Sequence, residues 1–183
     1  MNSPRTARFP TPLPSSMGRD AFIARFGGVY EHSPWVAERT FDRGPGPEAD
    51  TAEGLAALMA DTMRAASREE QMALIRAHPD LAGKAAVAGE LTDASRSEQA
   101  GAGLDQCTKA EFDEFQRLNA AYGQKFGFPF ILAVAGKTRN DILHAFRQRL
   151  GNDVESEFAE ALKQVDRIAR FRLTAMAEAG SDA

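Results

Sequence analysis

Hydrophobic positions recur every three or four residues along most of the chain, a period typical of amphipathic helices rather than strands. The clearest case follows Thr108 and predicts one buried helix face made of Phe112, Phe115, Leu118, Tyr122 and Phe126. Helix starts are marked at Ser67, Thr108 and Thr138, because each is followed three residues later by an acidic residue in capping-box spacing. The pattern therefore predicts a series of capped helices.

The segment 128–134 is the one good strand candidate in this pattern. A strand needs a partner, so we interpret the segment as a loop that enters a buried helix. The predicted fold is all-α, a single-domain helical bundle of about eight or nine helices. Residues 17–178 form the predicted domain, preceded by an extended or mobile segment, 1–16, and followed by a tail, 179–183.

The amino-acid composition argues against several classes of function. The net charge of −4, with no basic block, argues against a nucleic-acid partner. No apolar run approaches the ~20 residues that span a bilayer, so we expect no membrane association. The single cysteine, Cys107, excludes an intramolecular disulfide and a multi-cysteine zinc site. We interpret Cys107 as a small apolar residue rather than a nucleophile, and we expect a reducing location, the cytoplasm.

His78 is the first of three residues that could carry chemistry. Pro79 disfavours the α conformation in the residue before it, so we expect the preceding helix to stop at His78. A histidine there either caps the last carbonyls or acts as a general acid or base. His32 and His144 lack the spacing of metal ligands, so no metal site is predicted.

Glu98 is the second candidate. Ser95 and Glu98 have capping-box spacing, so a structural role at a helix start is one interpretation. A functional carboxylate is the other, and the two roles are compatible.

Arg172 is the third candidate, because it falls on a predicted apolar stripe of the last helix. The stripe is Val154, Phe158, Ala161, Val165, Ile168, Arg172 and Ala175. A guanidinium there is costly unless an anion meets it. That anion is a protein carboxylate or a substrate carboxylate, unless the side chain extends to solvent. We expect Arg172, His78 and Glu98 to meet at a small site for an anionic substrate.

Several motifs in one order carry a resemblance to a known family. They are His78-Pro79-Asp80-Leu81-Ala82-Gly83-Lys84, Ser95-x-x-Glu98-Gln99, Lys125-Phe126-Gly127-Phe128-Pro129-Phe130 and Phe171-Arg172-Leu173. Over roughly residues 15–177 the chain resembles the 2-oxo-4-hydroxy-4-carboxy-5-ureidoimidazoline (OHCU) decarboxylase family of urate breakdown.

The resemblance implies an all-helical homodimer, without metal or organic cofactor, that converts an anionic ureidoimidazoline to (S)-allantoin and CO₂. It implies that His78 is the catalytic imidazole, that Glu98 is its partner and that Arg172 binds the substrate. The other residues that it implies in substrate binding are Ser95, Gln99, Pro79, and the backbone around Phe130 and Ile131.

Two alternatives stay open at this stage. A related cofactor-free enzyme would act on another ureido or imidazole acid. A non-enzymatic helical interaction module would pair Arg172 internally and leave His78 and Glu98 far apart on the surface.

Overall fold

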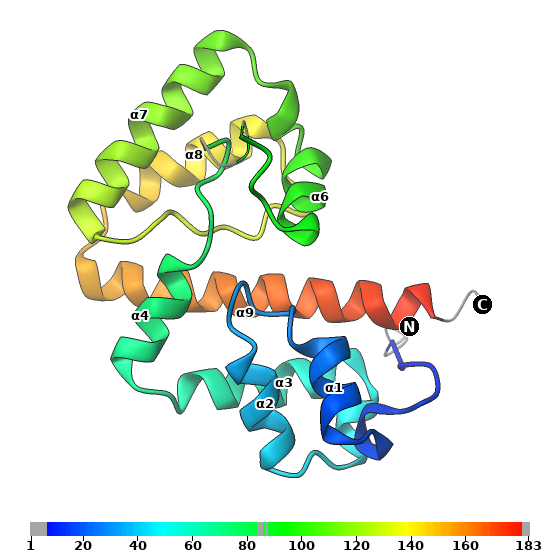
Figure 1. The fold of residues 1–183 in the computed structure, drawn as a ribbon. Coiled ribbons are helices and arrows are strands. Elements are labelled where there is room, and N and C mark those ends of the chain that lie inside the picture. The colour runs from blue at the N-terminus through cyan, green and yellow to red at the C-terminus, as the bar shows by residue number, and fades with distance from the viewer. Residues whose placement is uncertain (1–6, 84–85, 87, 181–183) are drawn as a thin grey trace, which may run out of the picture. The chain divides into compact units, whose positions relative to one another are not determined.

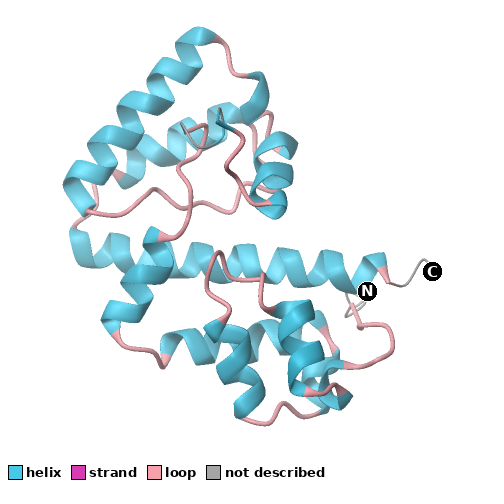
Figure 2. Ribbon diagram, viewed as in Figure 1, coloured by secondary structure: helices cyan, strands magenta, loops and turns pink. Residues whose placement is uncertain are grey.

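The computed structural model describes residues 7–83, 86 and 88–180, and within them only helices, turns and loops are found besides one isolated bridge between Arg8 and Thr51 (Figure 2). The α-helices of this part are α1 (Arg19–Phe26), α2 (Trp35–Asp42), α3 (Ala52–Arg64), α4 (Arg68–Arg76), α6 (Asp93–Gly101), α7 (Lys109–Phe126), α8 (Arg139–Arg149) and α9 (Val154–Ala179). Short 3₁₀ turns are η1 (Pro14–Ser16), η2 (Pro47–Asp50) and η3 (Leu104–Gln106). The all-α prediction is confirmed, whereas residues 1–6, Lys84 and 181–183 of the predicted segments lie outside the described residues.

The chain separates into two compact units. The first comprises Met1–Leu74 and Asp166–Ala183, and the second comprises Ile75–Val165, so α9 begins in the second unit and ends in the first (Figure 1). Of the predicted site residues, Arg172 belongs to the first unit. The other seven, His78, Pro79, Ser95, Glu98, Gln99, Phe130 and Ile131, belong to the second.

In the first unit, α1, α2 and α3 pack against one another in chain order (Figure 1). The core includes fully buried Phe22, Phe26 and Met59. Residues 7–16 are attached to this core, because the Phe9 amide donates to the Asp50 carbonyl at 3.0 Å and the Phe9 ring meets the Phe26 ring at 5.3 Å.

In the second unit, the core is an aromatic cluster around Tyr122 of α7. Its ring lies 4.5 to 5.9 Å from those of Phe126, Phe128, Phe130 and Phe146. The predicted capping boxes at Thr108 and Thr138 are both present and start α7 and α8. These local caps fix where the two helices begin, and the aromatic side chains fix how they pack.

The loop after α7 leads into α8. Gly127 ends α7 in the left-handed region, at φ 75°, where a residue without a Cβ is favoured. Residues 128–134 then form a buried loop without strand pairing, as expected. The helix that follows is α8, which begins at Arg139 and buries Ile142, Leu143 and Phe146.

The apolar stripe of α9 also differs from the prediction. Val154 is 44% exposed and Ala175 is exposed, whereas Ala169, Leu173 and Ala177 are buried. The predicted stripe repeats every seven residues, but an α-helix of 3.6 residues per turn drifts by about 20° over each such repeat. The buried positions therefore shift by one residue, so that Ala169 and Leu173 are buried instead of the residues before them. Arg172 lies next to this buried face.

The start of α4 gives a testable pH dependence. Glu70 accepts from the Ser67 amide at 3.0 Å and pairs with Arg39 at 2.5 Å. The Arg39 hydrogen bond, followed by those from Ser67, lowers the pKa of Glu70 from 4.5 to about 2. A lowered folded-state pKa stabilises the protein above the unfolded value, and this stability is lost as the pH falls through the folded value.

We therefore expect Glu70→Gln to lower Tm at pH 6 and the difference from wild type to shrink from about pH 4.5 toward pH 2. Thermal unfolding across this pH range measures it. The exposed neighbour Glu69→Gln is the matched control. A Tm difference that stays constant with pH would contradict the assignment.

Candidate active site

The His78 segment begins where α4 ends. The helix stops at Arg76, two residues earlier than predicted, and a turn follows in which the His78 amide donates to the Ile75 carbonyl at 3.2 Å. His78 is buried, with 9% of its surface exposed. Pro79 leads the chain from this turn into a loop, so the imidazole sits at a junction between helix and loop.

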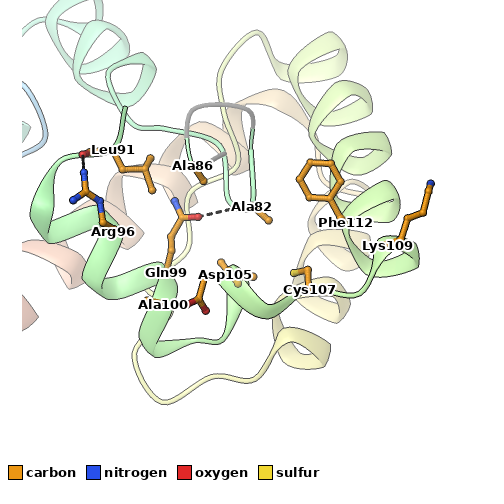
Figure 3. Close-up of a pocket in the computed structure, with 11 residues that line it drawn as sticks. Ala82, Ala86, Leu91, Arg96, Gln99, Ala100, Asp105, Cys107, Lys109 and Phe112 are labelled. Atoms are coloured by element: carbon orange, nitrogen blue, oxygen red, sulfur yellow. Dashed lines mark hydrogen bonds between the residues drawn. The ribbon is translucent and has the colours of Figure 1, made fainter. Parts of the chain in front are cut away.

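Gln99 joins this loop to α6, the helix that carries Glu98. Its Oε1 accepts from the Ala82 amide at 3.0 Å (Figure 3). Its Nε2 donates to the Asp80 carbonyl at 3.5 Å. Gln99 is itself buried, so these bonds are shielded from water. The structure thus brings the loop that follows His78 against the helix of Glu98, within one unit.

Two further side chains, from α7, hold the same loop. Gln116 Nε2 donates to the Ala82 carbonyl at 2.8 Å, and Asn119 Nδ2 donates to the Leu81 carbonyl at 3.0 Å. Ala82 has a φ of 48°, an uncommon left-handed conformation for a residue with a Cβ. Strained backbone persists only where its surroundings fix it, and here the amide and the carbonyl of Ala82 are both held.

The predicted capping box at Ser95 is wrong. Thr92 caps α6 instead, and its hydroxyl accepts from the Ser95 amide at 3.3 Å. The helix begins at Asp93, two residues before Ser95, so Ser95 is already helical and cannot be the N-cap. Ser95 and Gln99 are buried one turn apart, and Glu98 is half-buried in the second turn. Glu98 is therefore not placed to serve as the acidic residue of a cap.

The carboxylate nearest to His78 in sequence is that of Asp80, at the exposed edge of the loop. The surrounding protein displaces water from part of this group, and the desolvation raises the pKa of Asp80.

A cavity of about 740 Å³ lies between α6, the loop that contains Ala82, and the start of α7 (Figure 3). It is lined by Ala82, Ala86, Leu91, Arg96, Gln99, Ala100, Leu104, Asp105, Cys107, Lys109 and Phe112. At 100° per residue, Arg96 and Ala100 project about 160° away from Glu98 around the helix. Among the predicted site residues only Gln99 lines it, so this cavity is not the predicted catalytic site.

Cys107 does not offer a nucleophile to this cavity. Burial, followed by the nearby Glu111 carboxylate, raises the pKa of its thiol. A thiol with a raised pKa is protonated at neutral pH and weakly reactive.

Arg172 has protein partners in the first unit. Its Nη1 donates to Glu31 Oε2 at 2.9 Å and to the Val29 carbonyl at 3.2 Å. The side chains of Arg172 and Glu31 are only 9% and 2% exposed. Arg172 is thus paired with a protein carboxylate, which was one of the interpretations of its position. The interaction-module alternative expected such an internal pair. A role of Arg172 toward substrate stays a prediction.

Phe130 and Ile131 are nearly inaccessible, with 1% and 3% of their surfaces exposed. The Phe130 ring stacks on Phe146 at 3.8 Å, in the aromatic core. Their side chains are therefore structural, and any contact with substrate would use the backbone, as the resemblance implied.

Neither a membrane span nor a metal cluster is found in the described part of the chain. None of its helices is both long and apolar enough to cross a bilayer. Across residues 7–83, 86 and 88–180, no group of three or more His, Cys, Asp or Glu side chains is placed to hold a metal ion.

Gln116 and Asn119 are site-building residues that the sequence analysis missed. They flank the apolar face of α7, three residues apart, and only this polar pair beside a buried stripe could have indicated them. Their partners lie 34 and 38 residues away in sequence.

We expect Gln116→Ala to destabilise the protein by about 1–3 kcal/mol, because the buried Ala82 carbonyl loses this donor. Chemical denaturation measures the change, and amide hydrogen exchange of residues 80–83 should accelerate. Gln124→Ala, an exposed glutamine of the same helix, is the control. Equal stability and equal exchange in both variants would show that Gln116 does not hold the loop.

Comparison with known proteins completes the description of this site. Residues 15–174 match the family described as OHCU decarboxylase. A 2-oxo-4-hydroxy-4-carboxy-5-ureidoimidazoline decarboxylase from Haloferax volcanii is 43% identical over 154 residues, which cover 84% of this chain and 88% of the relative.

Two solved structures are also similar. A crystal structure of (S)-allantoin synthase, 32% identical, matches with a TM-score of 0.70 over 89% of this chain; the match spans 52% of the synthase chain. A crystal structure of OHCU decarboxylase in the presence of (S)-allantoin is 23% identical, with a TM-score of 0.65 over 90% of this chain and 100% of the other. At that identity the second likeness concerns the fold alone.

Proposed function

The chain belongs to the OHCU decarboxylase family, and we propose that it converts 2-oxo-4-hydroxy-4-carboxy-5-ureidoimidazoline to (S)-allantoin and CO₂ in urate degradation. The observation that carries the proposal is the contact made by Gln99. It fastens the loop after His78 to the helix that carries Glu98. The imidazole of His78 and the carboxylate of Glu98 therefore belong to segments that are separate in sequence but contact each other in the fold.

The proposed chemistry needs no electron sink from outside the substrate. When the bond to the carboxylate breaks, CO₂ leaves and its bonding electrons move into the C=N bond of the ring. One proton must then reach carbon from one face of the ring, which gives a single enantiomer. The protein has to orient the substrate, stabilise the charge that moves onto the ring and control this proton.

The roles that we propose for individual residues follow from these three requirements. His78, oriented and tuned by Glu98, acts on the 4-hydroxyl or carboxylate and in proton transfer. Arg172 binds the anionic substrate, supported by the fixed orientation that Glu31 and the Val29 carbonyl give its guanidinium. Ser95 and Gln99 hydrogen-bond the ring or the ureido group.

The test is circular dichroism at the allantoin bands. Urate oxidation followed by hydrolysis of the first product generates the unstable substrate, and the signal is followed with and without this protein. We expect optically active (S)-allantoin with the protein and racemic allantoin without it. Racemic product formed at the same rate in both samples would contradict the proposal. It would also favour a related enzyme acting on another ureido or imidazole acid.

Assembly and location are part of the same proposal. The family resemblance supports a homodimer, and the single cysteine supports a reducing location, the cytoplasm. Light scattering coupled to size exclusion tests the assembly, and a monomer mass over the whole working concentration range would reject the dimer.

A further inference from the structure

The buried loop 128–134 carries backbone polar groups that regular secondary structure does not satisfy. Buried amides and carbonyls need partners, and here side chains supply them. The Ile131 carbonyl accepts from Arg149 Nη1 at 2.6 Å, and the Ala133 amide donates to Gln164 Oε1 at 3.1 Å. The position of this loop therefore depends on side chains from α8 and α9.

Arg149 makes the more extensive of these two contacts. Its guanidinium carbon lies 4.5 Å from the centroid of the Phe130 ring. Its Nε donates to Glu157 Oε1 at 2.6 Å, and Nη2 lies 2.5 Å from the same oxygen. One planar group thus touches both the ring of Phe130 and the carbonyl of Ile131.

Glu157 is in turn held from two other sides. The Tyr122 hydroxyl donates to its Oε1 at 2.5 Å, and Asn152 Nδ2 donates to its Oε2 at 2.8 Å. Burial first, and then the hydrogen bond to Glu157, raises the pKa of Tyr122, so the phenol stays protonated and remains a donor. The carboxylate cannot turn without breaking one of these bonds.

Stability alone does not account for this arrangement. The Glu157 side chain is fully buried and that of Arg149 is 10% exposed. Removing two such ions from water is expensive, and an apolar pair of similar volume is often equally stable or more stable. Instead, the Glu157 carboxylate fixes the planar guanidinium of Arg149, so that its other N–H groups donate in a defined direction.

We propose that Arg149 is a positioning residue for decarboxylation, which sets the backbone of Phe130 and Ile131 where that backbone shapes the substrate pocket. This inference rests on the proposed function. Arg149 acts through the loop and does not itself touch the reacting atoms.

Arg149→Lys and Arg149→Met test the proposal in steady-state kinetics on freshly generated substrate. Both variants lose the planar guanidinium, and the lysine variant keeps the positive charge. We expect KM to rise about tenfold or more while kcat changes less than about threefold, the pattern of lost substrate binding. A purely structural role would lower the active fraction and Tm and leave KM unchanged.

Tyr122→Phe is the matched control, because it removes one bond to Glu157 and leaves the Arg149 contact with Ile131 in place. It should lower Tm and keep KM within about twofold of wild type. KM values that stay at the wild-type level in the Arg149 variants would overturn the inference. If Arg149→Met does not fold, Arg149→Lys decides alone. A wild-type protein without decarboxylase activity would refute the proposed function, whereas active wild type with unchanged variants refutes only the positioning role.

Discussion

Replacing His78 by alanine is expected to lower kcat/KM for decarboxylation by about 10²–10⁴-fold, the usual contribution of a positioned general acid or base. Glu98→Ala should lose activity to a comparable extent, because the imidazole would no longer be oriented. The measurement is the rate at which optically active allantoin forms, with the uncatalysed racemic reaction subtracted.

The fold should survive both substitutions. His78 lies in the turn after α4 and Glu98 is half-buried, so neither belongs to the aromatic core. Far-ultraviolet circular dichroism and Tm check this. His144→Ala, an exposed histidine of α8, is the control and should keep full activity. Near-normal turnover in either His78→Ala or Glu98→Ala would remove that residue from the mechanism.

Arg172→Met is expected to destabilise the protein by about 3–5 kcal/mol and to abolish activity. Glu31 is 2% exposed, and without the Arg172 cation its buried carboxylate becomes costly. This single variant cannot separate a substrate-binding role from a structural one, because both predict inactivity.

The double variant Glu31→Met with Arg172→Met separates them. Both charges are then absent, so most of the stability should return, less about 1 kcal/mol for the bond to the Val29 carbonyl. If Arg172 binds substrate, activity stays lost although the protein is folded. Activity that returns with stability would show that Arg172 serves only the ion pair. Arg170→Met, exposed on the same helix, controls for the loss of a surface cation.

The helical class and several helix starts could be predicted from sequence alone, because these depend on contacts within about four residues. A capping box joins a side chain to a backbone group three positions away, so Thr108 and Thr138 identified their helices correctly. Residue spacing could not decide whether Thr92 or Ser95 is the N-cap of α6. The motif containing His78 and Glu98 also indicated the family.

Contacts between groups that are far apart in the sequence could not be predicted in this way. Glu31 lies 141 positions from Arg172, and no local pattern names it as the partner. Gln116 holds the carbonyl of Ala82 across 34 positions, and Arg149 reaches the Ile131 carbonyl in a loop whose own sequence pattern resembles a strand and does not indicate this partner. A hydrophobic period reports which side of a helix is buried. The partner that a buried polar group finds there depends on how the whole chain packs.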